Sequence, residues 1–171
     1  MTSIRGRRAA WWVLVIALTG ATVGAAALGG WQMQVKSQQL PPVIEQPAQR
    51  QAAIQAASTG TVKVLSYSPN TLEQDFSAAE ALLTGDFLTY YKQFTNQVVA
   101  PAARENAVTT TATVLRVGVD SMTSQKAVLL VFVNQNTSRR DRPSPTLSSS
   151  SVLVGLAKVN GAWLINSFNP V

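Results

Sequence analysis

The chain has 171 residues, with 14 basic and 8 acidic side chains and a formal net charge of +6. Three arginines precede a long apolar run near the N-terminus, so the remainder carries only a mild +3, without the clustered basic face that nucleic-acid binding requires. The sequence has no cysteine and no histidine, and its acidic residues are scattered, so we expect no metal site, no cofactor, no catalytic residue and no enzymatic activity.

Residues 11–30 are predicted to form a transmembrane helix. Twenty residues at a rise of about 1.5 Å each cross the roughly 30 Å hydrocarbon core of a bilayer. The arginines place residues 1–10 in the cytoplasm and the rest outside the plasma membrane, and the tryptophans lie where an aromatic belt is expected. These flanking residues are Arg5, Arg7, Arg8, Trp11, Trp12 and Trp31.

Two alternatives concern the same apolar run. It could be a signal peptide cleaved after Ala25-Ala26-Ala27, although signal peptides have shorter apolar regions. Within the span, Gly20 and Gly24 form a GxxxG motif, which could bring a second transmembrane helix close, or which reflects only the general frequency of glycine in such helices.

Residues 31–47 are rich in glutamine and proline and are predicted to form an extended stalk, which is followed by an extracytoplasmic domain over residues 48–171. A helix is expected from Ala48, and Thr59-Gly60 is the expected break.

Two further helices are predicted on either side of Gly85. Thr71 to Gln74 fits a capping box that opens the first, Gly85 fits its left-handed C-cap, Asp86 caps the second, and Pro101 marks the end of the second. Large apolar residues recur at helical spacing in both helices and are expected to be buried. They are Leu72, Phe76, Ala79, Leu82 and Leu83 in the first helix, and Phe87, Tyr90, Tyr91, Phe94 and Val98 in the second.

From residue 108 onward the pattern is that of β-strands. Strands are predicted over residues 109–120, 126–135, 150–159 and 162–168. The first should place Thr111, Thr113, Leu115, Val117 and Val119 on one face, and the second is apolar on both faces. Asn160-Gly161 indicates a type I′ hairpin. No helix connects the strands, so we expect an α+β domain in which about three helices pack on a four-stranded antiparallel sheet.

Three groups of residues are candidate sites. Asp86 with Tyr90 and Tyr91 could perform acid–base chemistry, but no histidine can pair with them, and a structural joint is the favoured interpretation. Arginines in the loop 134–151 could contact anionic lipid or an acidic partner, or could simply be solvated. They are Arg139, Arg140 and Arg142. Apolar residues of the sheet could line a ligand pocket or belong to the core. They are Leu115, Val117, Leu129, Val131, Trp163 and Ile165.

The order of these parts resembles the Mce-associated membrane proteins of actinobacterial mammalian cell entry systems. The resemblance covers about residues 5–171 and rests on SYSPNTLEQD, TGDF and the final NGAW hairpin. It implies an NTF2-like (cystatin-like cone) domain, similar to the periplasmic domain of a type IV secretion scaffold. It also implies an accessory subunit of an Mce-type lipid importer, with transporter subunits as partners and no enzymatic activity.

Three other functions compete with this one. The chain could be a scaffold of a secretion-type envelope machine. The cone could bind a lipid or another small ligand in its pocket. It could also host an isomerase- or dehydratase-type enzyme, for which Asp75 and Asp120 are the available carboxylates, but neither has a histidine partner.

Overall fold

The computed structural model describes residues 46–171. The predicted anchor 11–30, its flanking residues, the Gly20–Gly24 motif and the stalk up to residue 45 lie outside this range. Within it, no helix combines the length and the apolar character that crossing a membrane requires. The elements in chain order are α2 (Pro47–Leu65), α3 (Leu72–Glu80), α4 (Gly85–Phe94), η2 (Thr95–Val99), α5 (Ala100–Asn106), β1 (Thr109–Met122), β2 (Lys126–Arg139), β3 (Arg142–Val159) and β4 (Ala162–Pro170).

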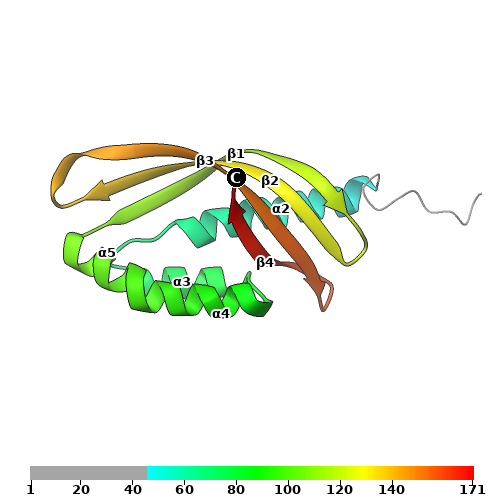
Figure 1. Ribbon diagram of the computed structural model, residues 1–171, viewed down its shortest axis with the longest axis horizontal. Coiled ribbons are helices and arrows are strands. Elements are labelled where there is room, and N and C mark those ends of the chain that lie inside the picture. The colour runs from blue at the N-terminus through cyan, green and yellow to red at the C-terminus, as the bar shows by residue number, and fades with distance from the viewer. Residues whose placement is uncertain (1–45) are drawn as a thin grey trace, which may run out of the picture. The chain divides into compact units, whose positions relative to one another are not determined.

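The four strands form one antiparallel sheet in the order β1-β2-β3-β4, and all helices lie on one of its faces (Figure 1). Side chains that alternate along the central strands point toward the helices and are fully buried. They are Leu129, Val131, Val133, Val154 and Leu156. The predicted α+β domain, with three helical segments on a four-stranded antiparallel sheet, is confirmed.

Helix α2 runs through the expected break without interruption, so that expectation is wrong. Its buried residues are small: Ala53, Ala57, Gly60 and Thr61. A Cβ atom on Gly60 would lie 2.5 Å from the Cδ1 atom of Ile165. The glycine therefore lets the helix approach β4 closely and does not end the helix.

The connection before α3 is held by a side chain other than the predicted one. Thr71 makes no capping bond to the backbone, and its hydroxyl instead donates to the carboxylate of Asp75 at 2.7 Å. The same carboxylate oxygen accepts a bond from the backbone N–H of Ser68 at 3.1 Å. Asp75 is therefore a structural residue of this turn.

The joint between α3 and α4 differs in detail from the prediction. Gly85 has the expected left-handed backbone, with φ of 61°. It does not cap α3, which already ends at Glu80, but is the first residue of α4. Residues 81–84 turn back to the sheet, where Leu83 forms a parallel bridge with Ile165. Asp86 lies exposed in the first turn of α4, without a side-chain capping bond.

The helix that begins at Gly85 also does not end at Pro101. A π-helical segment, η2, follows α4, and Pro101 lies in the first turn of α5, where its missing N–H is tolerated. The hydroxyl of the buried Thr95 donates to the carbonyl of Tyr91 at 2.7 Å at the start of η2. The helical segment ends at Ala107, which has a left-handed backbone with φ of 50°.

The alternation predicted for the first strand is interrupted. The register of β1 shifts between Val114 and Arg116, so Thr111, Thr113 and Leu115 are exposed whereas Val117 lies on the inner side, packed against the core. The second strand, predicted to be central because it is apolar on both faces, does lie between β1 and β3, although Phe132 on its outer face is exposed.

The predicted loop 134–151 belongs almost entirely to the sheet. It forms a long hairpin in which only Arg140 and Asp141 make the turn, and β2 and β3 pair as far as Arg139 and Arg142. The backbone N–H of Arg140 donates to the carbonyl of Asn106 at 2.9 Å. This bond ties the hairpin tip to the end of α5.

Candidate functional site

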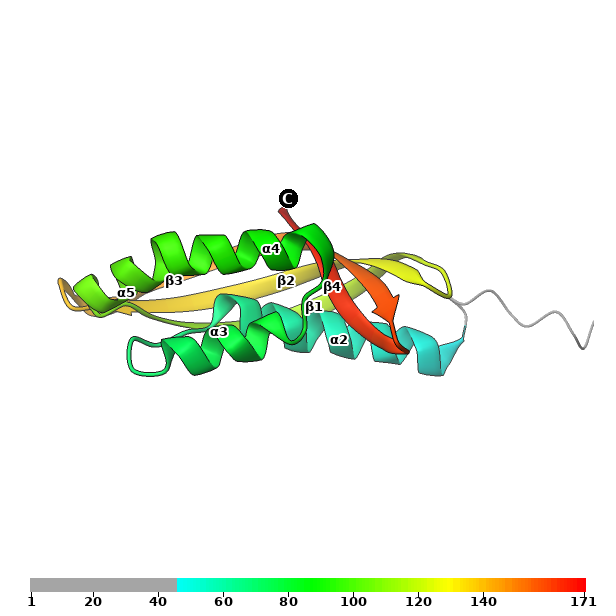
Figure 2. The same ribbon diagram turned by 90° about the horizontal axis from the view of Figure 1, so that it is seen from below.

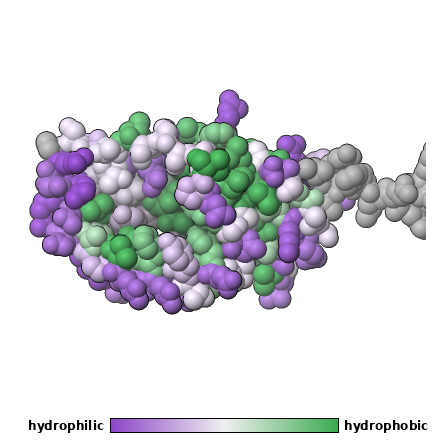
Figure 3. All heavy atoms as spheres, viewed as in Figure 1, coloured by the Kyte–Doolittle hydropathy of each residue, from purple (hydrophilic) through white to green (hydrophobic). Residues whose placement is uncertain are grey.

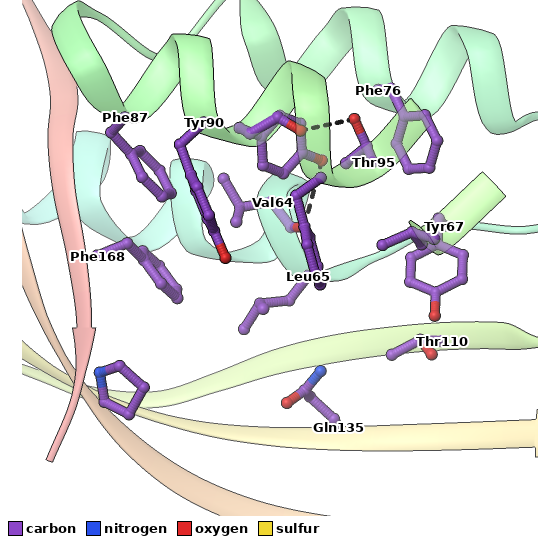
Figure 4. A pocket seen from close by; sticks show the side chains of 14 residues that line it. Val64, Leu65, Tyr67, Phe76, Phe87, Tyr90, Thr95, Thr110, Gln135 and Phe168 are labelled. Carbon is purple, nitrogen blue, oxygen red and sulfur yellow. Dashed lines mark hydrogen bonds between the residues drawn. The ribbon is translucent and has the colours of Figure 1, made fainter. Parts of the chain in front are cut away.

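A cavity of about 450 Å³ lies between the α4–η2 helix and the sheet. Its walls come from the end of α2, from α3, α4 and η2, and from the strands β1, β2 and β4 (Figure 4). Most of its lining is apolar or aromatic, as is common in ligand pockets. The lining residues are Val64, Leu65, Tyr67, Phe76, Phe87, Tyr90, Tyr91, Phe94, Thr95, Val99, Thr110, Gln135, Phe168 and Pro170.

Stacked aromatic rings form one wall of this cavity. Phe168 of β4 stacks on Phe87 with ring centroids 5.8 Å apart, Phe87 stacks on Tyr90, and Tyr90 stacks on Phe94 at 5.7 Å. Figure 4 shows Phe87 and Tyr90 hanging from α4 toward Phe168. We call these four residues the aromatic wall. It exists because α4 presents residues 87, 90 and 94 at helical spacing and β4 supplies a matching ring.

The outer part of the aromatic wall is open to solvent. Tyr90 is 58% exposed and Phe94 is 42% exposed, and Val98 follows them on η2 with 51% exposure. The prediction that these residues are buried along one stripe is therefore wrong, and of the stripe only Tyr91 is buried. Figure 3 shows apolar side chains around a hollow between the helices and the sheet, and hydrophilic side chains gathered at the end formed by α5 and the β2–β3 hairpin.

Tyr91 closes the inner side of the cavity and stays protonated. Its ring packs edge-on against Phe76 with centroids 6.3 Å apart, and its hydroxyl donates to the carbonyl of Val64 at 3.4 Å. Burial, followed by the negative charges of Glu80 and Asp75, raises the pKa of Tyr91 above its ordinary value. At neutral pH this phenol can act as a hydrogen-bond donor but not as a base.

The raised pKa of Tyr91 predicts that the domain loses stability in alkali. Below about pH 10 the phenol is neutral in both the folded and the unfolded chain, so its ionisation does not lower the free energy of unfolding. Above that pH the unfolded chain ionises while folded Tyr91 stays neutral, which costs about 1.4 kcal/mol by pH 11. We expect Tyr91→Phe to reduce the loss of unfolding free energy between pH 9 and 11 by this amount, measured by urea titration at each pH.

Other titrating groups contribute equally to both proteins, so the comparison isolates Tyr91. An identical pH dependence in wild type and Tyr91→Phe would show that this phenol ionises as easily in the folded chain as in the unfolded chain.

None of the six residues predicted to line a pocket lines this cavity. Leu129, Val131 and Ile165 are at most 1% exposed and form the core, and Trp163 is also buried. Val117 packs against the core, and Leu115 is exposed at a bulge. The cavity instead lies farther along the sheet, where the inner face carries Thr110 and Gln135.

Of the other candidate residues, Tyr90 and Tyr91 line this cavity, but the carboxylates and the arginines do not. Asp86 does not line it, nor do Asp75 and Asp120. Arg139, Arg140 and Arg142 cluster at the tip of the β2–β3 hairpin, where Arg139 pairs with Asp141 at 3.2 Å. The arginines are exposed, as expected for a contact surface or for a solvated turn.

The cavity lining offers groups that can bind a ligand. Its lining includes no carboxylate and no basic side chain, and no group of acidic residues within 46–171 is arranged to hold a metal ion. Apolar side chains can bury an apolar ligand, while Gln135, Thr110 and the tyrosine hydroxyls can orient it. The run of aromatic residues on α4 is the sequence signal for this site, because exposed aromatic residues are enriched at binding surfaces.

The chain is similar in sequence to proteins of Mycobacterium tuberculosis. It is 55% identical over 120 residues to the protein Rv1362c, a match that covers 70% of this chain and 54% of that protein. The chain thus spans about half the length of this relative. It is 41% identical over 122 residues to the outer membrane protein Rv1973, covering 71% of this chain and 76% of that protein. No protein-family model matches the chain.

Solved structures share the fold at low sequence identity. An IcmL-like type IV secretion system protein of Legionella pneumophila has a TM-score of 0.59 and 10% identity, covering 69% of this chain and 88% of that chain. CagV of Helicobacter pylori, a VirB8 homolog of a type IV secretion system, has a TM-score of 0.56 and 13% identity, covering 70% and 96%. The domain over residues 46–171 therefore has the VirB8-type, NTF2-like fold.

Proposed function

This chain belongs to the family of the Mycobacterium tuberculosis outer membrane protein Rv1973, and we propose that it is a non-catalytic scaffold subunit of a protein complex in the cell envelope. The observation that carries the proposal is the aromatic wall, which leaves Tyr90 and Phe94 exposed beside an open cavity. Exposed aromatic residues are the side chains on which protein interfaces most often depend. In this proposal residues 11–30 anchor the chain in the plasma membrane, and the domain acts outside it.

Two kinds of envelope complex fit this role. The fold shared with an IcmL-like protein and with a VirB8 homolog supports a machine of the secretion type. The resemblance of the SYSPNTLEQD, TGDF and NGAW motifs to Mce-associated proteins supports an Mce-type lipid importer. In both, the domain holds other subunits together and performs no chemistry. The absence of a carboxylate from the cavity lining agrees with such a role.

The exposed part of the aromatic wall is expected to bind the partner subunits. In a mycobacterial host, we expect the tagged full-length chain to recover subunits of one envelope complex in mild detergent. The double variant Tyr90→Ser/Phe94→Ser should bind the partner about thirtyfold more weakly, because hot-spot aromatic residues often contribute more than 1 kcal/mol each and about 1.4 kcal/mol is a tenfold change. Quantitative mass spectrometry of the recovered proteins measures the difference. Channel or permease subunits would indicate lipid import, and secretion subunits a secretion machine.

The matched control is Leu115→Ser, which also replaces an exposed apolar residue but lies on β1, away from the cavity. This variant should recover partners as the wild type does, and circular dichroism should confirm that all three proteins are folded. If the wild-type chain recovers no envelope subunit above an untagged control, the scaffold proposal is wrong.

A second function, lipid binding, is favoured by the cavity itself. A volume of about 450 Å³ with a largely apolar lining could hold part of an acyl chain. Lipid extraction from the same purified samples tests this function. A lipid that accompanies the wild type and Leu115→Ser, but not the double variant, would support lipid binding, whereas a wild-type sample without lipid would argue against it.

A further inference from the structure

Within residues 46–171, the edge of β3 beyond the end of β4 has no paired strand. Strand β4 pairs with β3 as far as Val152 and Pro170, and the backbone N–H of Val171 donates to the carbonyl of Ser151 at 3.0 Å. Strand β3, however, begins nine residues earlier, at Arg142, and there pairs with β2 on its other side. Among residues 46–171 no strand covers this part of the edge. Figure 1 shows the β2–β3 hairpin extending past the C-terminal end of β4.

The backbone groups along this edge are available for pairing. In an antiparallel sheet the N–H and C=O groups of one residue point to the same side, and the side alternates from residue to residue. Because Ser151 directs its carbonyl to Val171, the residues Ser149 and Leu147 direct their N–H and C=O groups to the same, open side. The prolines at 143 and 145 have no N–H, so the edge available for pairing is short.

The open edge is continuous with the cavity. Phe168 and Pro170, at the end of β4, line the cavity, so a strand that continued the line of β4 would extend that wall. On the sheet side, Gln135 lines the cavity and pairs with the exposed Ser148 of β3. On the helix side, α4 and α5 run along the β2–β3 hairpin (Figure 2). A side chain pointing inward from an added strand would therefore meet the cavity.

We infer that this edge and the aromatic wall together bind an extended peptide segment of a partner protein, which adds a strand to β3 and inserts alternate apolar side chains toward the cavity. The open N–H and C=O groups supply the pairing, and Tyr90 and Phe94 supply the apolar contact. Residues 148–151 of β3, beside this edge, are serines. Their hydroxyl groups can form hydrogen bonds with a peptide backbone, whereas an acyl chain would leave them without partners. The inference rests on the scaffold function proposed above and names its binding mode.

The arginines at the tip of the β2–β3 hairpin predict the charge at one end of this peptide. A strand antiparallel to β3 would finish beside Arg142, because β3 begins there. Neither Arg140 nor Arg142 has an ion pair among the described residues, whereas Arg139 is neutralised by Asp141. The segment should therefore carry acidic residues at its C-terminal end.

The test uses a defined peptide and the full-length chain in nanodiscs. The probe is a fluorescent peptide of about eight residues, in which valine and phenylalanine alternate with threonine and two glutamates end the chain. Two matched peptides carry N-methyl groups on alternate amides. One is methylated on its even-numbered amides, and the other on its odd-numbered amides. Only one of the two should lose binding in fluorescence anisotropy, because only every second amide of an added strand faces β3.

Variants of the edge provide the second arm. Ser149→Pro removes one edge N–H and should weaken binding about tenfold, which corresponds to about 1.4 kcal/mol, the size of one hydrogen bond. Ser149→Ala keeps that N–H, loses only the side-chain bond to Asn134, and should bind within about twofold of the wild type. Amide hydrogen exchange at Leu147 and Ser149 should slow when the peptide is added.

Several results would overturn the inference: no binding at about 1 mM peptide, equal binding of both methylated peptides, or equal binding by Ser149→Pro and Ser149→Ala. Competition by oleate combined with equal binding of both methylated peptides would mean that the site is a general apolar pocket. These failures differ from failure of the scaffold function. If the wild-type chain still recovers envelope subunits, strand addition alone is wrong, and if it recovers none, the scaffold function is wrong.

Discussion

Replacing Gly60 by valine is expected to lower the free energy of unfolding by about 3 kcal/mol. A Cβ atom at this position would lie 2.5 Å from Cδ1 and 3.3 Å from Cγ1 of Ile165, so α2 and β4 would have to move apart. Both residues are buried, and α2 packs on all four strands, so the shift would disturb most of the core. Pulse proteolysis in urea of the full-length chain in nanodiscs would measure the change.

Gly118→Val is the matched control for this prediction. Gly118 lies on β1, is exposed, and has nothing within 4 Å of the position of an added Cβ. Valine also favours strands, so this variant should unfold within about 0.5 kcal/mol of the wild type or be slightly more stable. Equal stability of Gly60→Val and Gly118→Val would show that α2 does not pack closely on β4 at Gly60.

The strands are the part of the fold that local sequence patterns predict best. Asn160 and Gly161 both have positive φ, at 50° and 85°, as a type I′ turn requires, and the antiparallel pairing follows from hairpin-sized connections. These features depend on residues close together in the chain. Two register shifts in β1, between Val114 and Arg116 and between Val119 and Ser121, nevertheless reverse the faces of the residues between them, and no nearby residue signals either shift.

Helix ends were harder to predict, because glycine and proline can serve purposes other than ending a helix. Gly60 lies inside α2 because Ile165, more than a hundred residues later, occupies the space that a side chain would need. Pro101 lies inside a helical segment because η2 changes the hydrogen-bonding pattern just before it. Both purposes depend on contacts or backbone geometry that a local pattern does not contain.

The cavity illustrates the same limit for function. The spacing of Phe87, Tyr90, Tyr91 and Phe94 predicts a buried helix face, but of these four residues only Tyr91 is buried. The others remain beside the cavity because α4 packs on β4 and leaves the adjoining part of the sheet uncovered. The positions of large apolar residues on α4 follow from the sequence, whereas the choice of which of them stay exposed depends on where β4 ends.

Replacing Ile165 by alanine is expected to cost about 3–4 kcal/mol of unfolding free energy. Ile165 is 1% exposed and is one of the largest fully buried side chains. Its backbone N–H donates to the carbonyl of Leu82 at 2.9 Å, and its carbonyl accepts from the N–H of Thr84 at 2.9 Å. These bonds hold the α3–α4 connection against β4, so the surrounding backbone is not free to collapse around the smaller side chain.

Ile165→Val separates the two roles of this side chain. It removes only the Cδ1 atom, should cost about 1 kcal/mol, and creates room above Gly60. Gly60→Ala should therefore be less destabilising in the Ile165→Val background than in the wild type, by about 1 kcal/mol. Additive effects in pulse proteolysis would contradict the close contact between these two residues, and an Ile165→Ala protein as stable as the wild type would contradict the buried position of Ile165 in the core.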